Sequence, residues 1–224
     1  MNRAGFIRAN TSVMAPPLVP EVRLHLAHEA VPLWQKTEDE LGEVGLPPPF
    51  WAFAWAGGQA LARHILDHAQ LVRGRSVIDL ASGSCLVGIA ALKAGAAHVL
   101  AADIDLFAVA AIELNGLLNE ILLPRHGERG LSVTSRDLLV SPPPLVEVIL
   151  VGDLFYEEAL ASRVHAWLRQ ARSQGTDVLI GDPGRSYLPR DSLENLAEYR
   201  VKVTRDLEDA EIKWTSVWRL APNC

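Results

Sequence analysis

The chain is poor in cysteine, in positive charge and in long apolar runs. Its 224 residues include two cysteines, Cys85 inside a small-residue turn and Cys224 at the C-terminus. This usage excludes a disulfide framework and fits a reducing compartment. No apolar run approaches the roughly 20 residues of a membrane-spanning helix. The formal net charge is −6 and the basic residues are scattered, so no basic surface for nucleic acid is indicated. We therefore expect no membrane or nucleic-acid partner and a protein or a small molecule as substrate. We also expect a monomer.

The composition is that of one globular domain with a short N-terminal extension. Hydrophobic residues make up 49% of the chain and charged residues 21%, which suits one α/β domain with a full core. We divide the chain into an N-terminal extension with helical content, residues 1–49, and a main domain, residues 50–224. Within the extension we expect a disordered terminus over residues 1–15. A strand or short helix and then a helix are expected over residues 21–45.

From Ser76 onward, strand-like and helix-like segments alternate. The predicted strands are 76–80, 98–102, 131–135, 146–152 and 177–181, and the predicted helices are 86–95, 106–120 and 157–172. Such alternation favours a parallel sheet with right-handed crossovers. The tail differs, because β-rich segments 199–207 and 212–220 flank the acidic turn 208–211 and predict an antiparallel hairpin at the sheet edge. The fold class is therefore α/β and Rossmann-like, with a mostly parallel sheet of seven strands.

The segment from Val77 to Gly88, VIDLASGSCLVG, has the pattern of a strand, a tight turn and a helix, and Asp103 ends the next apolar run. This arrangement is typical of a nucleotide-type cofactor site. Cys85 stands where a dinucleotide site needs a glycine, and Asp79 would repel a pyrophosphate but attract a cation. S-adenosylmethionine has ribose hydroxyls, no phosphate and a positive amino end. It is therefore compatible both with the side chain of Cys85 and with the negative charge of Asp79. The alternative is an ordinary βα turn whose small residues only allow tight packing.

Acidic residues follow each predicted parallel strand, at the edge where open parallel sheets bind their ligands. They are Asp79, Asp103, Asp105, Asp137, Asp153 and Asp182. Neighbouring carboxylates repel one another unless a cation or hydrogen-bond donors compensate them, and a sulfonium cofactor and a substrate amine would do so. The alternative is that these acids are ordinary loop residues. We expect Asp182 and Arg185 either to shape a substrate channel or to form an ion pair.

An aromatic segment, residues 50–58, precedes a predicted helix that runs to about Leu71. Its sequence is FWAFAWAGG. Large aromatic residues followed by two glycines indicate a wall or lid of the site. The alternative is that Trp51 and Trp55 belong to the core, because aromatic residues at helical spacing usually pack there.

Five segments together resemble the seven-stranded protein lysine methyltransferases with a D-x-x-Y motif, most of all the electron transfer flavoprotein beta-subunit lysine methyltransferases and their bacterial homologues. They are FWAFAWAGG (50–58), VIDLASGSCLVGIAA (77–91), AADIDLFA (101–108), GDLFYEE (152–158) and GDPGRSYLP (181–189). The match spans about residues 21–220. The resemblance implies the seven-stranded methyltransferase sheet, S-adenosylmethionine as cofactor, and methylation of a lysine on the flavoprotein beta subunit. It also implies the cytoplasm as location in a bacterium, or the mitochondrial matrix in a eukaryote.

The resemblance also implies functional residues. The cofactor-binding set is Trp55, Gly57, Asp79, Ala81, Gly83, Asp103, Ile104, Asp137 and Asp153. In this set Asp103 binds the ribose and Asp137 lies near the adenine. Asp153 and Tyr156, the D-x-x-Y pair, are the implied catalytic residues, which would hold the target amine with a carboxylate and an aromatic face. For Tyr156 the alternative is packing beneath the preceding strand. Cys85 departs from the family, which often has glycine at that position.

Other functions stay open at this point. An amino-methyltransferase of nucleic acids would carry an [ND]-P-P-[YFW] clamp, whereas residues 153–156 lack both prolines. A methyltransferase of the same fold could act on a small molecule or on another protein, such as a ribosomal protein, and a binding module could have lost the cofactor. No metal is expected, because the pairs His25/His28 and His64/His68 lack supporting ligands. We interpret them as ordinary surface histidines.

Overall fold

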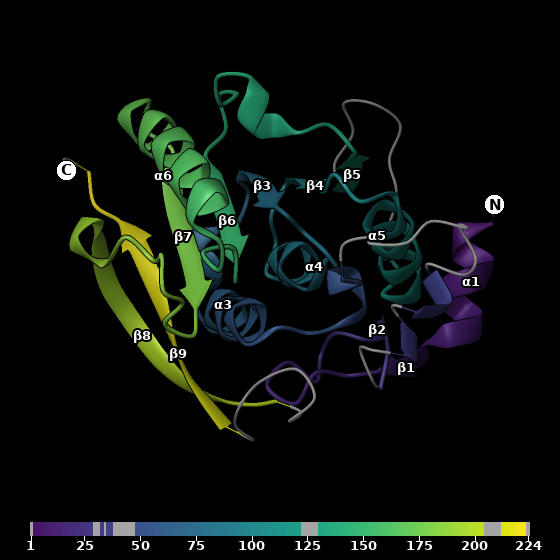
Figure 1. Cartoon of the computed structure of the whole chain (residues 1–224). Helices are drawn as coiled ribbons and strands as arrows, with labels where there is room; N and C mark the ends of the chain where they lie inside the picture. Colours follow the sequence, from purple (N-terminus) through teal and green to yellow (C-terminus); the bar gives the residue numbers. More distant parts are fainter. Residues whose placement is uncertain are drawn as a thin grey trace.

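The structure of the chain, a computed structural model, describes residues 2–28, 32–33, 35–37, 48–121, 130–203 and 212–222. Its centre is a seven-stranded sheet with the order β5-β4-β3-β6-β7-β9-β8 (Figure 1). The strands are β3 (Ser76–Leu80), β4 (His98–Ala102), β5 (Gly130–Thr134), β6 (Val148–Gly152), β7 (Asp177–Asp182), β8 (Leu193–Lys202) and β9 (Ile212–Leu220). The first five are parallel, and β9 pairs antiparallel with both β7 and β8. The predicted fold class and sheet are confirmed.

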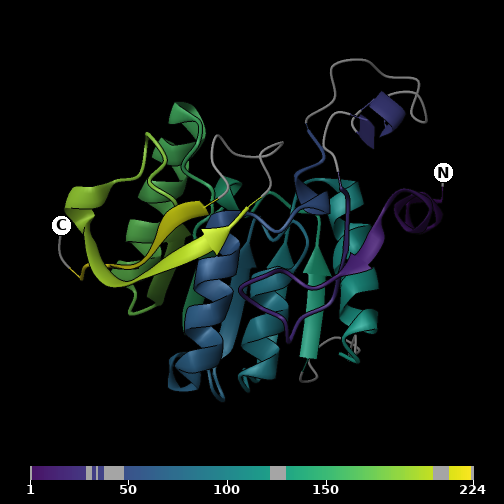
Figure 2. The same cartoon turned by 90° about the horizontal axis from the view of Figure 1, so that it is seen from below.

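Helices cover both faces of the sheet. They are α3 (Ala56–Asp67), α4 (Leu86–Lys93), α5 (Leu106–Leu118) and α6 (Glu158–Ser173), with short 3-10 turns η1 (Phe50–Ala52), η2 (Ala69–Leu71), η3 (Leu138–Val140) and η4 (Arg190–Ser192). Figure 2 shows α3 and α4 side by side on one face, and Figure 1 places α6 on the other. Val77 of β3 packs with the α3 and α4 core, whereas Ile78 packs with the α6 core. No helix among the residues described here is long and apolar enough to cross a membrane.

The C-terminal hairpin begins earlier than its sequence pattern predicts. Strand β8 starts at Leu193 rather than residue 199, and it ends at Lys202. Its first half contains Glu194 and Asn195, which are poor strand formers, but pairing with β9 holds them in the sheet across a bulge. Partner strands therefore override local propensity here. Residues 204–211, including the predicted acidic turn, lie outside the described residues.

The N-terminal extension is ordered where the structure describes it. It forms α1 (Arg3–Asn10), β1 (Ser12–Met14) and β2 (Leu24–Leu26), and the two strands pair antiparallel. The prediction of disorder over residues 1–15 is therefore wrong. Ile7 is fully buried and Phe6 packs edge-on against Phe107 of α5, with ring centroids 5.4 Å apart. Most of the helix predicted after β2 lies outside the described residues.

Two asparagines, one in α5 and one at its C-cap, attach the extension to the main domain. The Asn119 side chain accepts from the Arg23 amide at 3.1 Å, and Asn115 accepts from the His25 amide at 2.8 Å. Asn115 is fully buried and also donates to the carbonyl of Ser84 at 2.8 Å. Since Ser84 lies in the turn between β3 and α4, the extension is coupled to that turn through one side chain.

His64 departs from the sequence prediction. It is only 5% exposed, so it is not a surface histidine, whereas His68 is exposed. His64 Nδ1 lies 3.0 Å from the Tyr199 hydroxyl of β8, and its ring stacks on His68 at 4.3 Å. Burial, with a smaller effect of His68, lowers the pKa of His64 to about 4. Asp67 opposes this shift and Arg219 adds to it.

Acid should therefore destabilise the fold through His64. The folded pKa of about 4 lies below the ordinary 6.5, so this stability is complete above pH 6.5 and is lost as the pH falls toward 4. Between pH 7 and pH 5 the loss should be about 1 to 2 kcal/mol of unfolding free energy. Urea denaturation at both pH values tests this. His64→Phe should remove that part of the pH dependence and His68→Phe should keep it; equal pH dependence in His64→Phe and the unaltered protein would refute the assignment.

Candidate active site

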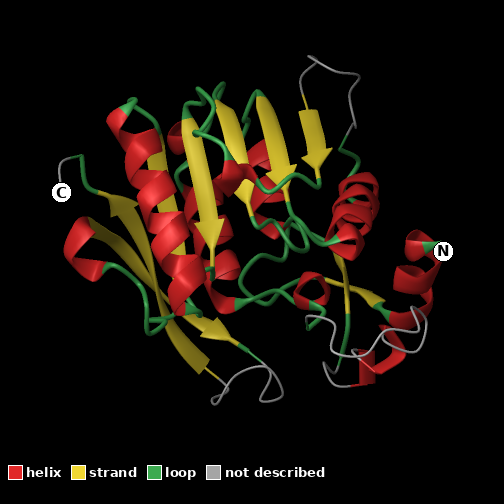
Figure 3. Ribbon diagram, turned by 45° about the horizontal axis from the view of Figure 1, so that its top comes forward, coloured by secondary structure: helices red, strands yellow, loops and turns green. Residues whose placement is uncertain are grey.

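A cavity of about 470 Å³ opens beyond the carboxyl ends of the parallel strands. Figure 3 shows these strands pointing to one edge of the sheet. Of the predicted site residues, those that line the cavity are Trp55, Asp79, Ala81, Gly83, Asp103, Ile104, Asp137, Asp153 and Tyr156. Gly57 does not line it, but its amide contacts Asp153. The fold thus brings residues from positions 55 to 156 into one place.

Asp79 lies beneath the N-terminus of α4. Its Oδ2 accepts from the Gly88 amide at 2.9 Å and from the Ser82 hydroxyl at 2.5 Å. Because the side chain is almost completely buried, its pKa rises to about 7, although both hydrogen bonds oppose the shift. Asp103 adds to the rise. A cation next to Asp79 would restore the ionised form.

Cys85 occupies the N-cap of α4 in a left-handed conformation, with φ at 65°. A glycine adopts this conformation without cost, whereas a residue with a side chain is strained in it. The Cys85 side chain is fully buried and burial raises the pKa of its thiol. Cys85 therefore acts as a small apolar residue that fills the turn.

Asp103 joins the turns that follow β3 and β4. Its Oδ2 accepts from the Gly83 amide at 2.9 Å, and its Oδ1 accepts from the Asp105 amide at 3.0 Å. Burial raises the pKa of Asp103 against the effect of these hydrogen bonds. Asp105 itself caps α5 by accepting from the Phe107 amide at 2.8 Å. The carboxylate at 103 is therefore fixed in place by backbone groups at the edge of the cavity.

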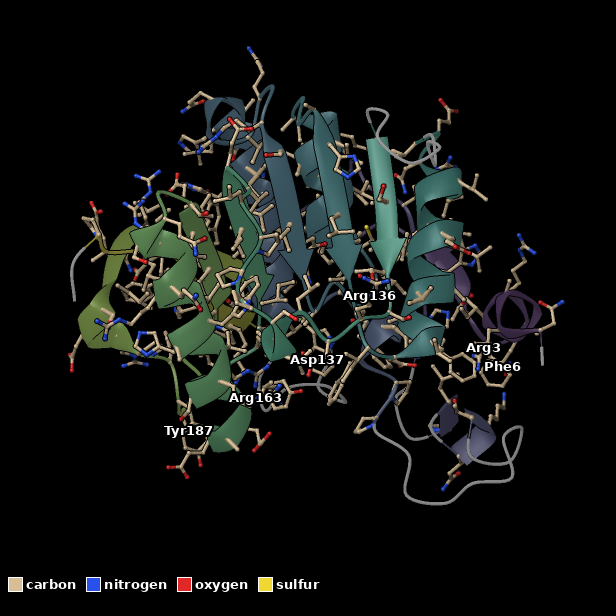
Figure 4. The ribbon with its side chains drawn as sticks, turned by 90° about the horizontal axis from the view of Figure 1, so that it is seen from above. Arg3, Phe6, Arg136, Asp137, Arg163 and Tyr187 are labelled. Atoms are coloured by element: carbon tan, nitrogen blue, oxygen red, sulfur yellow. The ribbon has the colours of Figure 1, made fainter. Side chains whose placement is uncertain are left out.

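Asp137 marks another wall of the cavity. Its Oδ1 accepts from the Leu139 amide at 2.9 Å, and its Oδ2 pairs with Arg163 of α6 at 2.9 Å. In Figure 4 these two side chains lie together near Arg136, which also lines the cavity. The sequence analysis did not identify Arg163. Nothing in the residues around it distinguishes an arginine that lines a cavity from one that only faces solvent.

The aromatic segment contributes both to the core and to the wall of the cavity. Trp51 is 1% exposed and stacks on Phe107 at 5.8 Å, so it belongs to the core. Phe50 and Trp55 line the cavity, and the Trp55 indole donates to the Phe50 carbonyl at 2.9 Å. Tyr156 lies 5.6 Å from Phe50 between ring centroids and is 44% exposed. Tyr156 is therefore at the mouth of the cavity rather than beneath β6.

Asp153 connects three elements. It follows β6 with a left-handed φ of 58°, and its carboxylate is almost completely buried. Its Oδ2 accepts from the Gly57 amide of α3 at 2.7 Å, and its Oδ1 pairs with Arg185 Nε at 2.6 Å. Arg185, from the loop after β7, thus forms the ion pair considered from the sequence, but with Asp153.

Asp182 does not line the cavity. Its Oδ1 accepts from the amides of Gly184 and Arg185 at 2.6 and 2.7 Å. It therefore shapes the loop that presents Arg185. Burial, partly offset by those amides, raises the pKa of Asp182 to about 6, and Asp153 adds to the rise. Among the described residues, no three His, Cys, Asp or Glu side chains form a group that could hold a metal ion.

The strand order, the antiparallel β9 between β7 and β8, and the acids at the ends of the parallel strands define a seven-stranded methyltransferase. The ribosomal protein L11 methyltransferase (PrmA) family model matches residues 60–141. The structure of Trm5b from Pyrococcus abyssi aligns with a TM-score of 0.53 and 14% identity over 95% of this chain and 56% of that one. This likeness shows the fold alone.

Several relatives match nearly the whole chain. The electron transfer flavoprotein beta subunit lysine methyltransferase of Xenopus laevis is 37% identical over 222 residues, covering 97% of this chain and 86% of that protein. The human protein of the same name is 34% identical over 223 residues, covering 97% and 81%. The chain belongs to the family of electron transfer flavoprotein beta subunit lysine methyltransferases.

The contact between α3 and Asp153 requires glycine at position 57. A Cβ there would lie 2.3 Å from the Gly181 carbonyl oxygen and 2.9 Å from the Asp153 nitrogen, whereas at Gly58 the nearest atom is 3.8 Å away. Gly57→Ala should lower the free energy of unfolding by about 2 to 3 kcal/mol through overpacking. Gly58→Ala, the matched control, should stay within about 1 kcal/mol of the unaltered protein. Urea denaturation measures both, and equal stability of the two variants would contradict this packing.

Proposed function

We propose that this protein transfers a methyl group from S-adenosylmethionine to a lysine of the electron transfer flavoprotein beta subunit. The family relationship supports this substrate. The observation that carries the mechanism is that one cavity joins Asp79 and Asp103 to the pair Asp153 and Tyr156. A cofactor site and an amine site that share a cavity suit group transfer between their ligands.

The cavity fits the cofactor in size and in charge. Its volume of about 470 Å³ lies in the range of cofactor pockets. Asp79 would be stabilised by a positive ligand, and Asp103 would accept hydrogen bonds from the ribose hydroxyls. Leu138 and Leu139, beside Asp137, line the wall where the adenine would lie. When bound, S-adenosylmethionine supplies a methyl group on a positively charged sulfur.

The chemistry requires a lysine without its extra proton. The bound cofactor would supply its methyl carbon to the lone pair of the lysine nitrogen, and the electron pair of the carbon–sulfur bond would stay with sulfur. The methylated nitrogen then loses a proton to water. The protein must align nitrogen, carbon and sulfur and keep competing water away. Phe50, Trp55 and Tyr156 would flank the lysine side chain, and Asp153 would orient the nitrogen.

The partial match to the L11 methyltransferase family does not favour a ribosomal substrate. The matched residues, 60–141, run from α3 to the 3-10 turn η3. They contain Asp79, Asp103 and Asp137, whereas Asp153, Tyr156 and Arg185 lie beyond them. That match therefore concerns the cofactor half of the cavity. Methylation of the flavoprotein requires both proteins in one compartment, the cytoplasm of a bacterium or the mitochondrial matrix of a eukaryote.

Cofactor binding tests the role of Asp103. Asp103→Asn removes the charge that would strengthen hydrogen bonds to the ribose, so the affinity for S-adenosylmethionine should fall about tenfold or more. Isothermal titration calorimetry measures this. Asp67→Asn, at the far end of α3, should leave the affinity unchanged. Unaltered binding by Asp103→Asn would remove Asp103 from the cofactor site.

Methyl transfer tests the function. The protein should place labelled methyl groups on a lysine of the purified flavoprotein beta subunit, as located by mass spectrometry of its peptides. Asp153→Asn should lower kcat by about 100-fold and leave cofactor affinity nearly intact, since it acts on the amine. In an extract from cells that lack the gene, label in a non-protein fraction would refute the proposal. Loss of cofactor binding in Asp153→Asn would instead move Asp153 to the cofactor.

A further inference from the structure

The ion pair between Arg185 and Asp153 lies inside the amine end of the cavity. Arg185 Nε is 2.6 Å from Asp153 Oδ1, and both residues line the cavity with Tyr156. The Asp153 side chain is 4% exposed and that of Arg185 is 25% exposed. The second carboxylate oxygen accepts from the Gly57 amide at the start of α3. The carboxylate therefore has a guanidinium on one oxygen and a helix N-terminus on the other.

An isolated carboxylate would be harmful at this point. It would attract the lysine as an ammonium ion and raise the pKa of that ammonium, because an opposite charge favours the charged form. An ammonium has no lone pair and cannot accept the methyl group. A site for methyl transfer needs a carboxylate whose charge is already compensated before the lysine arrives.

We propose that Arg185 is a positioning residue that compensates the charge of Asp153 and so lowers the pKa of the bound substrate lysine. This inference rests on the proposed function. Arg185 acts through Asp153 and through its own positive charge, which disfavours a second cation beside it. The lysine would consequently reach the cofactor as a free amine at neutral pH.

Several other titratable groups lie near this end of the cavity. Asp182 of β7 holds the Arg185 amide, and Glu157 follows Tyr156 after β6. Burial raises the pKa of Tyr156 above its ordinary 10, with smaller contributions from Glu157 and from Asp103 at the end of β4. The pKa of Asp182 is about 6. Between pH 7 and 9.5, Asp182 is therefore ionised and Tyr156 is neutral in the unaltered protein. Because the Arg185 charge lowers the pKa of Asp182, a neutral residue at position 185 should raise that pKa above about 6.

A second, polar cavity adjoins the outer side of Arg185. It is lined by His165 of α6 and by Arg190 and Asp191 of η4. Burial and Arg169 lower the pKa of His165, so it is neutral over the same pH range. Asp79, with its pKa of about 7, lies at the cofactor end, so rates must be compared at saturating cofactor. With the cofactor bound, the substrate lysine is the group whose pKa should depend on Arg185 in the alkaline part of this range, whereas the dependence of Asp182 on Arg185 falls at its acidic end.

The test is the pH dependence of kcat and KM for the flavoprotein between pH 6.5 and 9.5. Arg185→Gln keeps an N–H donor for Asp153 but removes the charge, and Arg185→Met is a second neutral variant. Arg185→Lys keeps the charge. Arg190→Gln is the matched control, because it removes a positive charge from the same segment without touching Asp153. Cofactor affinity and thermal denaturation of each variant are measured in parallel.

In Arg185→Gln, the midpoint of the kcat profile should rise by about one pH unit. At pH 7 this lowers kcat about three- to fivefold, and the rate should recover by pH 9.5 without an increase in KM. Arg185→Lys and Arg190→Gln should keep the original midpoint. An equal loss of kcat at every pH in both neutral variants would show a merely structural role and overturn the inference. Absence of transfer by the unaltered protein would instead refute the proposed function, and the inference with it.

Discussion

The hydrogen bond between the Gly57 amide and the Asp153 carboxylate holds the two halves of the site together. It joins the start of α3 to the end of β6 at 2.7 Å. The helix can approach this closely because Gly57 and Gly181 face one another without side chains between them. The same contacts stabilise the left-handed backbone of Asp153, which is costly for a residue other than glycine. The aromatic-glycine segment and the D-x-x-Y motif are therefore one structural unit, although about 100 residues separate them.

The proposed cofactor end of the cavity follows the same rule, since its acids are fixed by backbone amides. Asp79 accepts from the Gly88 amide and Asp103 from the Gly83 amide. These bonds orient the carboxylates before any ligand binds, which reduces the ordering needed on binding. The Asn115 side chain extends this support, because it links the turn at Ser84 to the N-terminal extension. The extension is thus part of the support for the site.

The sequence predicts those parts of the structure that depend on neighbouring residues. Strands β3 and β4 occur at their predicted residues, because parallel strands buried on both faces are continuous apolar runs. The predictions for α1, the start of β8 and His64 were wrong, because each depends on a distant partner: Phe107, β9 and Tyr199. For the site, residue types and strand ends indicated which acids would meet, and all of these acids except Asp182 line the cavity. The partners of those acids, such as Arg163 and Arg185, required the fold.

The two ends of the cavity differ in how they are held, and this difference bears on selectivity. The cofactor end lies on turns that follow adjacent strands and are fixed by backbone hydrogen bonds. The amine end lies on the loops after β6 and β7, which are joined by the pair Asp153–Arg185 and by a bond from the Tyr187 amide to the Phe155 carbonyl at 3.3 Å. Changes in these loops can alter which amine enters without disturbing the sheet or the cofactor turns. A shared cofactor half is therefore compatible with different substrates, and it explains why residues 60–141 match a methyltransferase family whose protein substrate is a different one.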